Sequence, residues 1–446
     1  MRSKKYRYLF LLLFALSMND CVKGENKEIA PETKEAVPLK EEVAEKIVIE
    51  PKYSFVKESL NHIHDKNGTL DSIFEIFSLL KVNPDSLKSP LSIVHIGDSH
   101  IQAGFLTGAV MRNMQKQFGN AGRGLVVPLR LAKTNAPRDY QISSDNTWIG
   151  GRLIQRKNTL PIGVGGIALA TENSKIDFTL KLRQKEQDDY GFNKITIFSD
   201  SVSPKLSAGR QNFSMLDPLK EYPFAYALEL KELTDSVRLK ANSGSNGKST
   251  FYGFSLENGK PGVLYHSIGI NGAHYLDYQK EGVLNQIQAL KPNLIILSMG
   301  TNEAFGRNFN NAEFRNQIDG VVKRVKAANP EAVLLLTTPA ECYVKRRVNN
   351  KTVYSPNTKV ARVRSVLVDY AKANGIAYWD LFELTGGAGS SKSWYANKLM
   401  AKDRIHFTET GYQLQGELLF NAFITEYNEY LSKRTGSDKT IRPADL

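Results

Sequence analysis

The pattern of hydrophobic and polar positions divides the chain into two kinds of sequence. In 91–118 and 263–430, short apolar runs alternate with segments whose apolar residues recur every three or four positions. The expected strands are 93–97, 263–270, 294–299, 332–336 and 376–380. One helix is expected after the first strand and ends near 118, and four more are expected at about 276–290, 312–328, 358–374 and 410–430. Alternating strands and helices predict a parallel sheet covered by helices on both faces.

Between about 125 and 262 the helical spacing disappears. Short runs with a period of two take its place at 176–182, 194–198, 225–230, 237–240 and 250–256, and turn-rich clusters such as 241–247 separate them. Repeated short strands of this kind predict a β-sandwich of jelly-roll type. Because sheet-and-helix sequence lies on both sides, the sandwich is expected as an insertion in a loop of the parallel sheet. Residues 52–80, by contrast, have the spacing of one or two helices.

The first residues have the pattern of an export signal. Basic residues between Arg2 and Arg7 precede a short apolar core over 9–16, which is too short to span a bilayer. Two processing sites compete: 15–17 fits ordinary cleavage, and Cys21 lies where a bacterial lipoprotein carries its acylated cysteine. The stretch 22–51 is rich in Lys, Glu and Pro and indicates a flexible tether, which favours the lipid anchor. Either site predicts export from the cytoplasm.

Composition narrows the partners of the chain. The 446 residues have a net charge of +13, which favours anionic surroundings such as wall polymer, acidic polysaccharide or lipid headgroups. The basic residues are spread along the chain without a nucleic-acid-binding motif, so nucleic acid is not an expected partner. Cys21 and Cys342 are the only cysteines, which excludes a disulfide framework, and Cys342 is interpreted as a packing residue.

Polar residues follow several of the expected strands. Gly97-Asp98-Ser99, Asn271-Gly272 and Asn302 each stand at a strand end, where open α/β sheets place their ligands. Asp403 and His406 stand three apart, just before the last helix. Taken singly, each has a purely structural interpretation, such as a helix cap or a turn. Together, a serine, a histidine and an acid supply what acyl transfer requires, and fixed donors near Ser99 supply an oxyanion hole.

In this order the residues closely resemble the SGNH, or GDSL-type, hydrolases. The signature of that family is a Ser, a Gly, an Asn and a His in four separated blocks, matched here by 97–99, Gly272, 300–302 and 403–406. The resemblance implies a flavodoxin-like three-layer α/β fold with Ser99, Asp403 and His406 as catalytic triad. It also implies an oxyanion hole formed by Ser99, Gly272 and Asn302, without a metal or a cofactor. One departure is His100, where the first block normally has Leu.

An exported domain of this family interrupted by a carbohydrate-binding-like sandwich looks like the peptidoglycan O-acetylesterases of Gram-negative bacteria. That resemblance implies removal of acetyl groups from the C6 oxygen of N-acetylmuramic acid, by a periplasmic enzyme or outer-membrane lipoprotein. The alternatives are an esterase for acetylated xylan or capsular polysaccharide, a lipase, an acyltransferase and a wall-binding scaffold. The expected organisation is a signal peptide (1–21), a tether (22–51), a hydrolase domain (52–124 and 263–432), a sandwich (125–262) and a tail (433–446).

Overall fold

The computed structural model describes residues 43–157, 159–183, 191–200, 207–209, 212–215, 222–243, 247–280 and 282–435. The predicted signal peptide, the predicted acylation site Cys21 and most of the predicted tether and tail lie outside these residues. Within the described ranges, no helix combines the length and the apolar character needed to cross a membrane.

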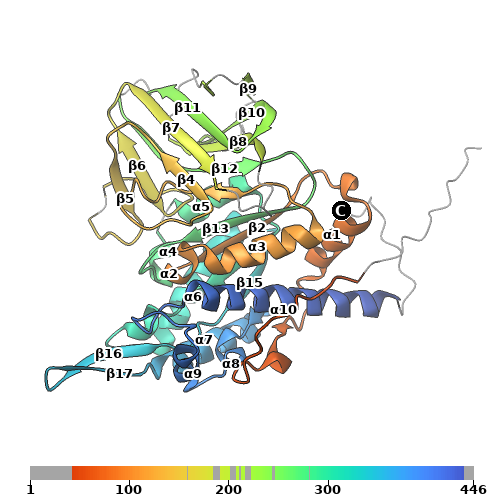
Figure 1. Ribbon diagram of the computed structural model, residues 1–446, viewed down its shortest axis with the longest axis vertical. Helices are drawn as coiled ribbons and strands as arrows, with labels where there is room; N and C mark the ends of the chain where they lie inside the picture. Colours follow the sequence, from red (N-terminus) through yellow and green to blue (C-terminus); the bar gives the residue numbers. More distant parts are fainter. Residues whose placement is uncertain are drawn as a thin grey trace, which may run out of the picture. The chain divides into compact units, whose positions relative to one another are not determined.

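A six-stranded sheet forms the centre of the α/β part (Figure 1), in the order β1-β18-β15-β14-β2-β13. Its strands are β1 (Ile63–His64), β2 (Leu91–Gly97), β13 (Val263–Gly269), β14 (Leu294–Ser298), β15 (Val333–Thr337) and β18 (Ala377–Trp379). All neighbours pair in parallel except β1, which pairs antiparallel with β18 at one edge. In chain order the five parallel strands lie 2-1-3-4-5, so the topological switch point falls between β2 and β14.

The predicted parallel sheet and its helices are confirmed. The apolar runs of β2 and β14 are explained by burial, since all seven residues of β2 are buried. Helices α1, α3 and α10 pack together as one group, and α4, α5, α6 and α7 as another. Their bounds are α1 (Asp71–Val82), α3 (Phe105–Phe118), α4 (Tyr275–Tyr278), α5 (Val283–Gln286), α6 (Asn311–Ala328), α7 (Lys359–Asn374) and α10 (Glu409–Thr435). Short helices α2 (Ser99–Gln102), α8 (Leu381–Leu384) and α9 (Ser390–Ala396) follow strand ends or loops.

Two helices expected as single segments are broken at glycines, which corrects the prediction. The helix after β2 divides into α2 and α3 at Gly104, whose φ is +74°. The segment predicted at 276–290 divides into α4, α5 and a 3-10 helix, Ile287–Leu290, around Gly282. Gly282 has φ +111°, and a β-carbon there would lie 1.8 Å from the carbonyl oxygen of Ile162. Backbone conformation and close approach therefore require glycine at this break.

The strands expected between 125 and 262 are present, in two antiparallel sheets. One sheet contains β5, β6, β12, β8, β10 and β9 in that order, with β3 paired to β12, and the other is β11-β7-β4. The bounds are β3 (Gly124–Val126), β4 (Tyr140–Ser143), β5 (Ile149–Arg152), β6 (Ile167–Thr171), β7 (Lys175–Leu182), β8 (Phe192–Ser199), β9 (Phe213–Met215), β10 (Ala225–Thr234), β11 (Ser236–Asn242) and β12 (Ser249–Glu257). Phe178 of β7 packs edge-on against Phe251 and Phe254 of β12, with ring centroids 5.0 and 5.1 Å apart. Trp148 stacks on Phe178, so its ring packs in this part.

Two features were not expected from the sequence. An antiparallel hairpin of β16 (Tyr343–Val348) and β17 (Lys351–Pro356) projects from the α/β part, at the lower left of Figure 1. The second feature is an extended strap over 43–49 along α10. Asn421 accepts from the backbone N–H of Ile47 and donates to its carbonyl oxygen, and Asn428 does the same for Ala44.

Candidate active site

Ser99 is presented at the end of β2, a strand whose seven residues are all buried. It begins α2 directly after β2, at the switch point of the sheet. Gly97 is required there by packing, because a β-carbon would lie 2.3 Å from Ile101 and 2.6 Å from the carbonyl oxygen of Ser298. Asp98 caps α2 by accepting from the backbone N–H of His100 at 2.9 Å. The capping interpretation therefore holds for Asp98, while the Ser99 hydroxyl is directed elsewhere.

The Ser99 hydroxyl lies in a hydrogen-bonded row with a histidine and a carboxylate. Its Oγ is 2.9 Å from Nε2 of His406, and Nδ1 of His406 is 2.7 Å from Oδ2 of Asp403. Sequence separates Ser99 from His406 by 307 positions, and the fold brings them into contact. In this geometry the imidazole is placed to take the serine proton while the carboxylate fixes the tautomer with a proton on Nδ1.

Asp403 is held in its ionised form by donors on its own loop. Its Oδ1 accepts from the backbone N–H groups of Ile405 and His406, at 2.9 and 3.0 Å. Partial burial acts to raise the pKa of Asp403, but the hydrogen bonds from the His406 ring and from these two backbone groups outweigh it. The net result is a pKa below the ordinary range. The carboxylate is therefore ionised at neutral pH, as an orienting acid requires.

The loop that carries His406 is attached to the rest of the molecule at three places. Residues Met400 and Phe407 form a β-bridge across it, and Phe407 packs on Trp394. The backbone carbonyl of Arg404 accepts from Tyr343 of β16 at 2.9 Å. The Arg404 guanidinium lies 4.3 Å from the ring of Tyr354 and 4.1 Å from that of Tyr395. Arg404 has φ +58°, a conformation that residues with a side chain seldom adopt, so these contacts hold the loop in a demanding shape.

Gly272 lies in a turn that is fixed from both sides. The preceding N–H, that of Asn271, donates to Oε1 of Gln102 at 2.6 Å, and the following carbonyl, that of Ala273, accepts from Asn302 at 2.9 Å. Gly272 itself has φ +79°, which explains the glycine. Among the described residues, the backbone N–H groups of Gly272 and Ser99 have no hydrogen-bond acceptor. Both are thus available as oxyanion donors beside the serine.

Gln102 is a site residue that the sequence interpretation missed. It is buried one helical turn after Ser99, and its Nε2 donates to Thr134 Oγ1, Asn135 Oδ1 and the Asn135 carbonyl at 2.8–2.9 Å. Its other end holds the Gly272 turn. The only signal in the sequence was a glutamine at an otherwise apolar helical position next to the serine. Such a signal becomes interpretable only when the partner loop is known.

Asn302 comes from the loop after β14 and lies between the other two oxyanion candidates. Its Nδ2 donates to the Ala273 carbonyl, and a longer contact of 3.3 Å reaches Oδ2 of Asp98. Burial, together with repulsion from the buried Glu303, raises the pKa of Asp98 to about 7. The amide thus has one firm bond and one weak one, and the weak one can be exchanged for a developing oxyanion.

His100 lies beside the triad but is arranged as a neutral support. Its Nδ1 is 2.9 Å from the Tyr412 hydroxyl, and its ring centroid is 5.3 Å from that of His406. Burial and repulsion from His406 lower the pKa of His100 to about 3, so the ring is neutral at physiological pH. The ring in contact with the Ser99 hydroxyl is that of His406.

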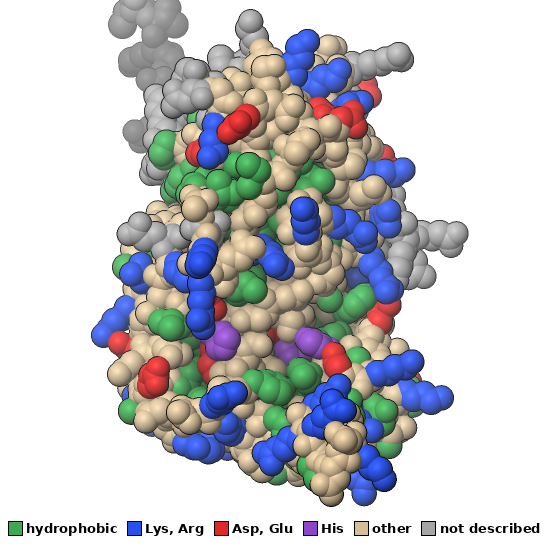
Figure 2. Space-filling model, turned by 90° about the vertical axis from the view of Figure 1, so that its left-hand side faces the viewer, with side chains coloured by type: hydrophobic (Ala, Val, Ile, Leu, Met, Phe, Trp, Pro, Cys, Tyr) green, Lys and Arg blue, Asp and Glu red, His purple; other side chains and the backbone are tan. Residues whose placement is uncertain are grey.

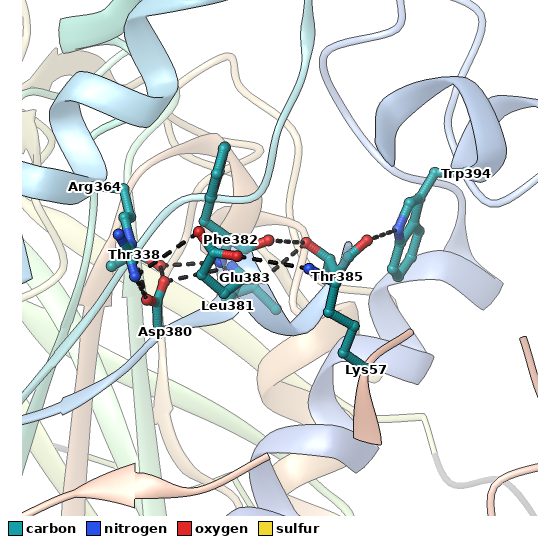
Figure 3. Close-up of polar contacts among 9 residues, drawn as sticks. All are labelled: Lys57, Thr338, Arg364, Asp380, Leu381, Phe382, Glu383, Thr385 and Trp394. Carbon is teal, nitrogen blue, oxygen red and sulfur yellow. Dashed lines mark hydrogen bonds and ion pairs between the residues drawn. The ribbon is translucent and has the colours of Figure 1, made fainter. Parts of the chain in front are cut away.

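A cavity of about 40 Å³ lies next to Asp98 and His100 at the ends of β14 and β15. Thr338 and Leu381, which line it, belong to the polar network drawn in Figure 3. Thr338 donates to Asp380 Oδ1 and accepts from the N–H of Phe382, and Arg364 holds Asp380 Oδ2 with two nitrogens at 2.5 and 2.8 Å. Trp394 donates to the Thr385 carbonyl, which ties α9 to the turn after α8. The strand ends and the catalytic loop therefore share one supported framework.

Histidine, Lys and Arg side chains share one face of the molecule. Figure 2 shows histidine side chains near the middle of one face of the molecule, with Lys and Arg side chains above and below them.

Among the described residues, the ligand atoms of His62, Glu426 and Glu429 lie close enough to hold a metal ion. The three share no residue with the triad, and His62 and Glu426 already contact each other at 3.3 Å.

Ser99, His406 and Asp403 form one hydrogen-bonded row at the switch point of an α/β sheet. This is the arrangement of a serine hydrolase. Residues 234–414 match the GDSL-like Lipase/Acylhydrolase family, and the matched range includes Gly272, Asn302, Asp403 and His406. This part of the chain is therefore similar to that family of acylhydrolases, and the chain is a hydrolase. Ser99 lies before the matched range, and the fold supplies its connection to the other residues.

Solved structures show how far the fold extends. A peptidoglycan O-acetylesterase is similar to 82% of this chain and 99% of its own, with a TM-score of 0.63 and 19% sequence identity. A lipase/acylhydrolase from Enterococcus faecalis is similar to 37% of this chain and 77% of its own, with a TM-score of 0.28 and 20% identity. No curated protein matches the sequence significantly. The first similarity shows a shared fold over most of the chain.

Proposed function

We propose that the protein is a serine esterase that removes O-acetyl groups from the C6 oxygen of N-acetylmuramic acid in peptidoglycan. The observation that carries the chemistry is the row from Ser99 through His406 to Asp403, with bonds of 2.9 and 2.7 Å. The substrate class rests on the fold shared with a peptidoglycan O-acetylesterase, which extends over nearly the whole of that enzyme. It also rests on the net charge of +13, which suits a polymer with peptide carboxylates.

The proposed reaction has two steps with the same machinery. In the first, Ser99 Oγ attacks the acetyl carbonyl carbon while Nε2 of His406 takes the hydroxyl proton. The backbone N–H groups of Ser99 and Gly272 and the Asn302 amide stabilise the oxyanion, and His406 returns the proton to the departing sugar oxygen. In the second, water attacks the carbonyl carbon of the acetyl-enzyme while His406 takes one of its protons. The bond between the acetyl carbon and Ser99 Oγ then breaks as His406 passes this proton to Ser99 Oγ, and the released acetic acid ionises to acetate.

For residues 125–262 we propose an inserted β-sandwich of jelly-roll type that acts as a separate module. The packing of Phe178 between the two antiparallel sheets supports this proposal. Removal of the module as a unit is not a clean test, because Gln286 of α5 accepts from the N–H of Val164 within it. Sugar binding by the intact protein, measured by calorimetry with stem-free glycan strands, tests whether the module or its surroundings recognise carbohydrate.

We also propose export to the periplasm, with Cys21 as lipid anchor. The basic start, the short apolar core and the tether composition support this proposal. Mass spectrometry of the mature protein from membranes tests it. An acylated cysteine at position 21 is the expected first residue, and a mature chain beginning near position 18 would contradict the anchor while leaving export intact.

The experiment that tests the enzymatic proposal is acetate release by protein beginning at Lys40. O-acetylated peptidoglycan and acetylated xylan are compared, with Ser99→Ala as control. Release from peptidoglycan, lost in the variant, is the expected result. Release from xylan alone would contradict the substrate and keep the chemistry, and equal release by the Ser99→Ala variant would contradict the chemistry itself.

A further inference from the structure

Two segments beside the triad carry positive charge without any acidic residue. The hairpin 343–356 contains four Lys and Arg side chains, and the segment 149–157 contains three. Lys345, Arg347, Arg156 and Lys157 are exposed, and none forms an ion pair with a described residue. Unpaired cations of this kind raise the local concentration of an anionic ligand and accelerate its capture.

The hairpin directs one of its two faces to the catalytic loop. Residues opposite each other on antiparallel strands share a face, and Lys345 is paired with Tyr354 and Arg347 with Thr352. Tyr354 is the residue whose ring lies 4.3 Å from the guanidinium of Arg404, within the loop of Asp403 and His406. Lys345 and Arg347 therefore extend outward from the active site along the same face. The hairpin points to the left in Figure 1, which is toward the viewer in Figure 2.

The other segment reaches the site from the opposite element. Ile154 approaches the oxyanion turn so closely that a β-carbon on Gly272 would lie 3.8 Å from it. The carbonyl of Leu153 accepts from Lys280 at 2.7 Å, which fixes this segment to the loop after α4. Arg156 and Lys157 follow within three residues of Ile154. One pair of cations therefore belongs to a segment that contacts the Gly272 turn, and the other belongs to the hairpin that contacts the loop of His406.

We propose that these two segments bind the peptide-stem carboxylates of a peptidoglycan strand on either side of the acetylated sugar. The proposal rests on the proposed function and names the part of the substrate that this surface recognises. Stem peptides carry carboxylates at intervals along an otherwise uncharged glycan, which matches two separate groups of cations better than one. Acetylated xylan offers no such regular peptide anions.

The test is a charge reversal of each segment in the full enzyme. The two variants are Lys345→Glu with Arg347→Glu, and Arg156→Glu with Lys157→Glu. Each is expected to lower kcat/KM on stem-bearing O-acetylated peptidoglycan by about tenfold at low salt, because electrostatic steering has effects of this order. Hydrolysis of 4-nitrophenyl acetate, which is uncharged and small, is expected to stay within about twofold. The loss of kcat/KM on peptidoglycan in the reversed variants should become smaller at high salt, because salt then screens charges over a distance of a few ångströms.

The matched control is Arg324→Glu with Lys326→Glu, an equal change of charge. These exposed residues lie near the C-terminal end of α6, at the edge where the parallel strands begin, opposite to the active site. A second comparison uses the same peptidoglycan after amidase treatment, which removes the stems and leaves one lactyl carboxylate on each muramic acid. The reversed variants should differ little from wild type on this material.

Each outcome has a distinct meaning. An equal loss for the α6 control, or the same loss on stem-free strands, would overturn the stem-binding surface in favour of a general charge effect. Unchanged rates in both reversed variants would overturn it as well, while the proposed function stands as long as wild type releases acetate from peptidoglycan. If wild type releases none, both proposals fail together.

Discussion

The nucleophile side and the base side of the site are held in different ways. Ser99, Gly272 and Asn302 lie at the ends of buried parallel strands, and Gln102, Gly97 and the main chain of the sheet fix them. Asp403 and His406 lie on a loop with 49% and 38% of their side chains exposed, and local contacts with the hairpin and α9 hold that loop. The nucleophile side thus shares its interactions with the core of the fold. Substitutions on the base side, by contrast, should have little effect on stability.

Ser99→Ala gives the largest expected effect. Loss of the nucleophile should lower kcat on 4-nitrophenyl acetate by about 10⁴-fold or more. The melting temperature should shift by only a few degrees, because the hydroxyl contributes a single hydrogen bond to a half-exposed ring. Kinetics and thermal unfolding of the same preparation check both parts. A variant that keeps wild-type turnover would refute the triad.

Asp403→Asn should act almost as strongly on the rate. The neutral amide neither fixes the tautomer with a proton on Nδ1 nor stabilises the imidazolium as the carboxylate does, so a loss of about 10³–10⁴-fold is expected. Stability should change little, since the loop is exposed on the base side. An effect below tenfold would mean that another group orients His406.

Gln102→Ala tests the nucleophile side from within the core. Without Gln102 the Gly272 turn loses its anchor, and kcat/KM should fall by roughly 10- to 100-fold, less than the cost of removing an oxyanion donor outright. Stability should fall as well, by about 1–3 kcal/mol. The control is Gln115→Ala, another buried glutamine, which bonds the Gly122 and Val263 carbonyls away from the turn. Equal rate losses in both variants would contradict the positioning role.

Low pH should weaken the buried sheet. Burial lowers the pKa of His95 to about 3, while its unfolded value is near 6.5. The unfolded chain therefore binds a proton that the folded protein does not bind, so the stability from neutral His95 is present above pH 6.5 and is lost as the pH falls toward 3. Between pH 7 and pH 5, His95→Gln should remove about 2 kcal/mol of the fall in unfolding free energy. Denaturant titrations at both pH values measure the unfolding free energy. The same fall between pH 7 and pH 5 in the variant and in wild type would contradict the prediction.

The smallest expected effect concerns the support of the catalytic loop. Tyr395→Ala removes one of the rings that stack on Arg404, a contact worth about 0.5–1 kcal/mol at an exposed position. We expect a two- to fivefold fall in kcat with little change in KM, because the loop shape is less well fixed. Phe309→Ala, which removes the ring beneath Arg362, a contact that involves no residue of this loop, is the control and should leave kcat unchanged.

The sequence predicted the parts of the site that local pattern determines. Ser99 and Asn302 follow buried apolar strands, and His406 precedes a long helix, so local pattern predicted their positions and the resemblance to the SGNH hydrolases predicted their roles. Gln102 and Arg404 were not found, because their roles depend on loops that lie at distant positions in the chain. The hairpin was missed for a similar reason: its strands are exposed and charged on both faces, so they lack the alternation that marks a half-buried strand.

The breaks in the helices show another limit of the sequence. The apolar spacing of 276–290 indicates one helix, yet the tertiary contact of Gly282 with Ile162 divides it. The central strands were predicted well because helices cover them on both faces. The alternation of strands and helices along the chain predicts this covering. The antiparallel edge strand β1 has only two residues and no periodicity to detect.

The strap over 43–49 determines where a force that pulls on the preceding chain would act on the folded protein. A pull on the chain before residue 43 is transmitted to α10 through the paired bonds of Asn428 and Asn421. Asn421 lies twelve residues, or about 18 Å, along the helix from its first turn. If the proposed lipid anchor at Cys21 holds the chain, force would therefore reach the far part of α10 and its packing on α3 and α1. The loop of His406, which precedes the first turn of α10, would then stay unstrained.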